Sequence, residues 1–153
     1  MHDLIQKIQH KFPGISFTQD HSFHWSAQRK TIYYNAKDEN PAWSLLHELG
    51  HASLGHSNYI SDIVLLRMEA AAWEQACEFG KQFDITINQD HINECLDTYR
   101  DWLYKRSICP TCTAHGVQTD SRVYLCINCH TSWAVSKNRF CRTYRKTSKK
   151  SLM

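Results

Sequence analysis

The spacing of apolar residues along the first hundred positions predicts a series of helices. Residues at three- or four-residue spacing are typical of a short amphipathic helix over 3–12, which would contain Leu4, Ile5, Ile8 and Phe12. Longer patterns of the same kind predict helices over 41–54, 60–83 and 89–105. Asn40-Pro41 favours a helix start at that point, with Asn at the N-cap and Pro at the first helical position.

Extended segments are expected at both ends of this helical series. The β-branched and aromatic residues of 30–35, and the shorter segment 15–17, predict strands. A few strands followed by helices in series indicate the α+β fold class. From Cys109 onward the pattern changes to short extended pieces and turns, with 123–125 alternating like a strand.

These patterns predict three regions. We expect a main domain over 1–106, a small C-terminal module over 107–140, and a polar, basic tail over 141–153 that is disordered. A chain of 153 residues has room for one compact domain and such an appendage. No apolar run approaches the roughly 20 residues that cross a membrane, and the N-terminus lacks the apolar stretch of a signal peptide. We therefore expect a cytoplasmic protein without a membrane partner.

The net charge of +3 conceals two oppositely charged parts. Residues 1–103 contain 8 Lys/Arg and 14 Asp/Glu, whereas 104–153 contain 10 Lys/Arg and a single acid, Asp120. The basic part also carries aromatic residues, namely Trp133, Phe140 and Tyr144. Basic and aromatic side chains together can bind phosphates and stack on bases, so nucleic acid is one candidate partner of the module and tail. A solubilising tail and a docking site for an acidic protein are the alternatives.

The sequence His47-Glu48-Leu49-Gly50-His51 matches H-E-x-x-H. On a helix, positions i and i+4 share a face, so both imidazoles can bind one zinc ion. Glu48 would then act as the general base towards zinc-activated water. A third ligand is missing from the motif itself.

The segments TIYYN, SLLHELGHASLGH and RMEAAAWEQA together resemble the ImmA/IrrE family of metallopeptidases, across about residues 15–85. The resemblance implies a zincin-like domain in which Glu69, on the next helix, joins His47 and His51 as a zinc ligand. It also implies proteolysis: the family members known to be proteases cut a DNA-binding repressor. For this chain, a repressor would be a separate protein substrate. From the residues alone, His56 is the rival third ligand, provided that the helix ends at Gly55 and the chain then brings His56 back towards the motif histidines.

Four cysteines in two C-x-x-C pairs separated by 13 residues predict a second, structural zinc site in a β-hairpin zinc ribbon. They are Cys109, Cys112, Cys126 and Cys129. Four thiolates fill a tetrahedral site and leave no position for substrate. Cys77 and Cys95 are expected to be core residues and Cys141 to be free.

The function that these patterns favour is a zinc metallo-endopeptidase, with one catalytic and one structural zinc ion and Glu48 as the catalytic residue. The first alternative is a nucleic-acid- or protein-binding module whose peptidase domain is incidental or inactive. The second is a SprT-like protease of DNA-bound proteins, which also pairs H-E-x-x-H with a zinc ribbon but takes its third ligand from a downstream histidine. No residue is assigned to oxyanion stabilisation.

Overall fold

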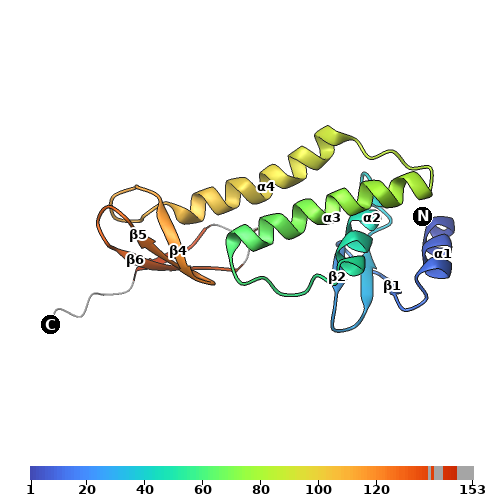
Figure 1. Ribbon diagram of the computed structural model, residues 1–153, viewed down its shortest axis with the longest axis horizontal. Helices are drawn as coiled ribbons and strands as arrows, with labels where there is room; N and C mark the ends of the chain where they lie inside the picture. Colours follow the sequence, from blue (N-terminus) through green and yellow to red (C-terminus); the bar gives the residue numbers. More distant parts are fainter. Residues whose placement is uncertain (138, 140–142, 148–153) are drawn as a thin grey trace. The chain divides into compact units, whose positions relative to one another are not determined.

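The computed structural model describes residues 1–137, 139 and 143–147 (Figure 1). It contains helices and two small sheets, which confirms the α+β class. The chain forms two compact units, the first made of 1–58 and 67–92 and the second of 59–66 and the chain from 93 onward. The expected boundary near residue 106 is therefore not where the compact units divide, because the second unit includes the start of one long helix and most of the next.

The helices lie within two residues of their predicted ends. They are α1 (His2–Lys11), α2 (Pro41–Ser53), α3 (Asp62–Gln82) and α4 (Gln89–Ser107). Pro41 occupies the first turn of α2 as expected, but the Asn40 side chain makes no capping hydrogen bond. The main-chain oxygen of Asn40 instead accepts N–H bonds from Trp43 and Ser44. Proline at this position removes one of the N–H groups that a helix start leaves without a partner.

The first unit contains a three-stranded sheet in the order β1-β3-β2. Its strands are β1 (Ser16–Gln19), β2 (His24–Ser26) and β3 (Thr31–Tyr34). β1 runs parallel to β3 and β2 runs antiparallel to it. The strand β2 is not predicted from the sequence, since three residues are too few to show an alternating pattern. Helix α2 packs against β2 and β3, so the edge strand β2 lies beside the helix that carries the H-E-x-x-H motif.

Apolar faces of the helices and of β3 form the core of the first unit. Its buried residues include Ile5, Ile8, Ile32, Leu45, Leu46, Leu49, Ala72, Trp73, Ala76 and Phe79. Burying a side chain of this size contributes about 1.5–3 kcal/mol relative to leaving it exposed. The three leucines all lie on α2 within five residues, so this packing fixes the rotation of the motif helix.

The second unit contains a four-stranded antiparallel sheet in the order β4-β5-β6-β7. The strands are β4 (Gly116–Asp120), β5 (Val123–Cys126), β6 (Ser132–Val135) and β7 (Arg145–Thr147). Finding β7 corrects the expectation that the whole tail over 141–153 is disordered, because 145–147 form a hydrogen-bonded edge of the sheet. The tail residues 141, 142 and 148–153 lie outside the described part of the chain.

Trp133 is the central side chain of the second unit's core. It is fully buried, packs against Tyr124 with rings 5.6 Å apart, and donates its indole N–H to the Arg106 carbonyl at 3.0 Å. A Cβ on Gly116 would lie only 2.4 Å from the Trp133 ring, so this position of β4 requires glycine. Beside this core, the Tyr124 hydroxyl donates to the buried carboxylate of Asp62.

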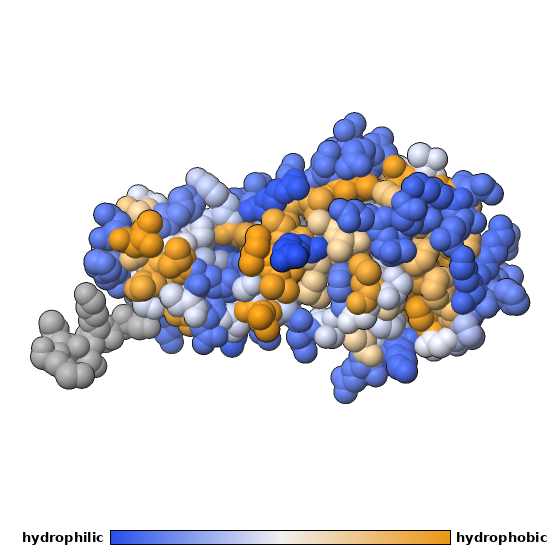
Figure 2. All heavy atoms as spheres, viewed as in Figure 1, coloured by the Kyte–Doolittle hydropathy of each residue, from blue (hydrophilic) through white to orange (hydrophobic). Residues whose placement is uncertain are grey.

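Apolar side chains also reach the surface. On the face drawn in Figure 2, apolar groups lie among a mainly hydrophilic covering. Over all faces of the described residues, the large exposed apolar side chains are those of Leu54, Ile60, Ile63, Tyr104, Val117, Ile127 and Tyr144. Within the described residues, no helix combines the length and apolar character needed to cross a membrane.

Candidate metal centres

Two helices bring His47, His51 and Glu69 together in the first unit. The Nε2 atoms of the two histidines, one turn apart on α2, lie 3.1 Å from each other. The Oε2 atom of Glu69, from α3, lies 3.2 Å from the first and 3.5 Å from the second. The structure thus places side by side the two motif histidines and the glutamate that the family resemblance implied.

The geometry of these three atoms fits a shared metal ion. Zinc bound tetrahedrally at about 2.0–2.1 Å would hold two nitrogens about 3.3 Å apart. Glu69 Oε2 is buried and, despite its short distances to the imidazoles, makes no well-directed hydrogen bond with any residue that the structure describes. A buried carboxylate oxygen without a bonded partner is costly, whereas a cation between it and the two Nε2 atoms would satisfy all three.

Gly50 allows α2 and α3 to approach closely enough for this contact. A Cβ at position 50 would lie 2.4 Å from the main-chain oxygen of Ala72. Ala72 follows Glu69 by one helical turn, so the same close approach places the Glu69 carboxylate beside the histidines. This role of Gly50 was not predicted from the sequence; the available signal was a glycine inside an otherwise regular helix.

Electrostatics favour the ionised form of Glu69. Burial raises the pKa of Glu69, but its contacts with His47 and His51 outweigh burial and lower the pKa to about 2. Burial lowers the pKa of His51, and the neighbouring Glu69 and Glu48 raise it above its ordinary value. A carboxylate facing two imidazoles is the donor set that suits a divalent transition metal.

Glu48 lies next to this group without belonging to it. Its carboxylate is buried, and the main-chain N–H of Trp25 from β2 is close enough to lower its pKa. Burial raises the pKa of Glu48, and this effect is opposed by the charges of His47 and His51. A carboxyl group beside the two motif imidazoles is placed as a general acid–base requires.

His56 is near the group but faces its outer side. Its Nδ1 atom lies 2.9 Å from Nδ1 of His51, which is the ring nitrogen directed away from His47 and Glu69. The group that could hold a metal contains His47, His51 and Glu69 and does not contain His56. Burial and the neighbouring His51 lower the pKa of His56, which favours the neutral ring. The geometry therefore favours Glu69 over His56 as the third ligand.

Aromatic side chains that were not predicted as part of the site cover one side of His47. The Trp73 ring stacks on the His47 ring with centroids 4.2 Å apart and planes at 27°. His91 contacts both Trp73 and Trp43, at 5.6 Å and 5.0 Å between ring centroids. These contacts limit the rotation of the His47 imidazole about its side-chain bonds.

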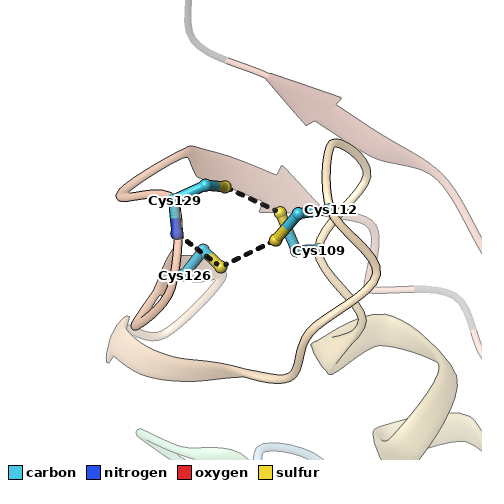
Figure 3. Close-up of side chains that lie close together, drawn as sticks. All are labelled: Cys109, Cys112, Cys126 and Cys129. Carbon is cyan, nitrogen blue, oxygen red and sulfur yellow. Dashed lines mark hydrogen bonds between the residues drawn. The ribbon is translucent and has the colours of Figure 1, made fainter.

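The four cysteines of the second unit converge in the same way (Figure 3). The sulfur atoms of Cys109 and Cys129 are 3.6 Å apart, and those of Cys112 and Cys126 are 3.4 Å apart. Zinc bound tetrahedrally at about 2.3 Å would hold its sulfurs about 3.8 Å apart. The spacing is far longer than a disulfide bond, and all four cysteines are free thiols that fit one tetrahedral ion.

The two C-x-x-C pairs form equivalent turns. In the first, the N–H of Thr113 donates to the Cys109 carbonyl at 3.1 Å; in the second, the N–H of His130 donates to the Cys126 carbonyl at 3.1 Å. Thr113 and His130 both have positive φ, 62° and 58°, at the same position of their turns. The hydroxyl and main chain of Thr131 lower the pKa of Cys129 to about 6, which favours a thiolate ligand.

Among the residues that the structure describes, neither the cysteines outside the four-cysteine group nor the residues expected to bind nucleic acid belong to the two candidate metal sites. Cys77 and Cys95 are partly buried, and Cys141 lies outside the described residues. Trp133 is fully buried and cannot stack on a base, and Phe140 lies outside the described residues. Two of the arginines make internal contacts: Arg139 covers the Tyr99 ring and Arg145 donates to the Ile108 carbonyl.

Comparison with known proteins finds no match among protein-family models, curated proteins or solved structures. The resemblance to the ImmA/IrrE family therefore rests on the sequence motifs alone.

Proposed function

We propose that the chain is a zinc-dependent endopeptidase whose first unit is a zincin-like domain of the ImmA/IrrE type. The observation that supports this most strongly is the convergence of His47 Nε2, His51 Nε2 and Glu69 Oε2, with Glu48 held beside them as a separate carboxylate. Two histidines and one glutamate are a donor set of catalytic zinc sites, which keep a fourth position open.

The cysteine group is proposed to hold a second, structural zinc ion. Its four thiols supply every ligand of a tetrahedral site, so it has no position for a substrate. In this proposal the second unit is a zinc ribbon whose stability depends on the metal.

Zinc in the first group would lower the pKa of a water molecule to about 7 and act as a Lewis acid towards the peptide carbonyl. Glu48 takes a proton from the attacking water and later gives it to the leaving amine nitrogen. The burial of Glu48 beside His47 and His51 places its carboxylate for both transfers. A protein substrate, cytoplasmic location and contact with a DNA-binding repressor remain predictions from the sequence.

The replacement Glu48→Gln tests this proposal. Glutamine keeps the shape of the side chain but cannot accept the proton, so cleavage of a peptide library should fall by about 10²–10⁴-fold while zinc content stays unchanged. Asp101→Asn, a carboxylate-to-amide change at an exposed position of α4, is the matched control and should cleave like the parent. Equal cleavage by the Glu48→Gln variant, or cleavage that survives removal of zinc from the parent, would overturn the proposal.

A further inference from the structure

The two ring nitrogens of His51 have different surroundings. Nε2 faces His47 and Glu69, whereas Nδ1 lies 2.9 Å from Nδ1 of His56. A neutral histidine that binds a metal through Nε2 carries its proton on Nδ1, which then acts as a donor. With a metal on Nε2 of His51, Nδ1 of His56 would be the acceptor, and His56 would carry its own proton on Nε2.

The end of α2, rather than helical periodicity, brings His56 to this place. On a continuing helix, a residue five positions after His51 would point well away from it. Here Gly55 adopts a left-handed conformation, with φ of 66°, directly after the helix. The N–H of Gly55 donates to the Ala52 carbonyl at 3.2 Å and that of His56 to the His51 carbonyl at 3.0 Å. These paired bonds form a Schellman turn, which reverses the chain and returns His56 to the His51 ring.

Trp25 on the edge strand β2 holds the turned segment. Its indole N–H donates to the main-chain oxygen of His56 at 3.0 Å. Its main-chain N–H contacts the carboxylate of Glu48. One residue of the sheet therefore contacts both the segment that supports a metal ligand and the general base.

We propose that His56 is a positioning residue that fixes the tautomer and orientation of His51, and that Trp25 holds His56 for this purpose. The proposal rests on the proposed metal site, but it does not require that the site hydrolyse peptides. Groups that accept a hydrogen bond from a metal-binding histidine typically change metal affinity by about 10–100-fold when removed. His56 contacts the outer nitrogen of His51, so it acts through that ligand.

Titration with Co²⁺ tests the proposal on the full-length protein with zinc retained in the cysteine group. His56→Phe keeps an aromatic ring but removes the acceptor, so Co²⁺ should bind about 10–100-fold more weakly, with an altered d–d absorption spectrum. His24→Phe is the control. His24 lies next to Trp25 in β2 and stacks on Tyr33 of β3, so this variant should bind Co²⁺ like the parent. His56→Asn offers an amide oxygen as acceptor and should bind Co²⁺ more tightly than His56→Phe.

A double-mutant cycle separates positioning from general destabilisation. Trp25→Phe should weaken Co²⁺ binding, and combining it with His56→Phe should weaken binding no further than His56→Phe alone, because Trp25 acts through His56. Parental affinity in His56→Phe, or fully additive losses in the double variant, would overturn the proposal. If His56→Phe does not fold, His56→Asn and Trp25→Phe carry the same comparison. The expected losses of Co²⁺ affinity in these variants, with a parent protein that cleaves no peptide, would count against the proposed function alone.

Discussion

Replacing Gly50 by alanine should weaken metal binding by His47, His51 and Glu69, because it pushes α2 and α3 apart. The new Cβ would lie 2.4 Å from the Ala72 main-chain oxygen, and Cβ atoms essentially never approach within 3.0 Å of another heavy atom. A main-chain oxygen cannot rotate away as a side chain can. Helix α3 must therefore move by at least about 0.6 Å at this point.

The cost can be worked out from two opposing effects. Forcing an extra carbon into a packed contact costs about 1–3 kcal/mol, whereas alanine in place of glycine inside a helix contributes up to about 1 kcal/mol. We expect Gly50→Ala to lower the free energy of unfolding by about 1–2 kcal/mol. Glu69 moves with α3, and metal–ligand distances tolerate only about 0.2 Å, so zinc affinity should fall at least about tenfold.

Urea unfolding and zinc competition with a chelator measure the two effects separately. Gly14→Ala is the control, because no atom lies within 4 Å of a Cβ at position 14. Adding Ala72→Gly to Gly50→Ala should not restore zinc binding, since the obstructing oxygen belongs to the main chain. A Gly50→Ala protein that is more stable than the parent and binds zinc equally well would refute this reasoning.

Two further predictions concern the second unit. Cys112→Ser should reduce bound zinc from two ions to one per chain and leave the ion at His47, His51 and Glu69 in place. Metal analysis after dialysis measures this. Loss of both ions, or of neither, would contradict the independence of the two sites. Tyr124→Phe removes a hydrogen bond to the buried Asp62 carboxylate and should cost about 1.5–3 kcal/mol in urea unfolding, whereas the exposed control Tyr144→Phe should cost less than about 0.5 kcal/mol.

Local patterns were enough to predict the helices, the two motif histidines and the four cysteines. The predicted ends of α2 lie within one residue of the observed ends, because the apolar residues whose spacing predicts the helix also fill the core. The cysteine group follows from spacing alone, since each C-x-x-C forms a turn of its own. Glu69 is different: its position beside the histidines depends on how α2 and α3 cross, and only the family resemblance pointed to it.

The features that the sequence did not reveal depend on contacts between distant segments. Strands β2 and β7 are each three residues long and gain their hydrogen bonds from a neighbouring strand. Trp25 and His56 are 31 positions apart and show no shared motif, yet one hydrogen bond joins them. The buried Trp133 was predicted to stack on bases together with Phe140 and Tyr144, because basic neighbours conceal its place in the sheet core.

The central claim is that His47, His51 and Glu69 hold a zinc ion with one open position. A crystal structure with anomalous scattering recorded at the zinc absorption edge tests it most directly. We expect two zinc peaks per chain, one bound by the four cysteine sulfurs and one about 2.0–2.2 Å from His47 Nε2, His51 Nε2 and a Glu69 oxygen. No zinc at the second position, His56 in place of Glu69, or a fourth protein ligand closing the site would contradict it.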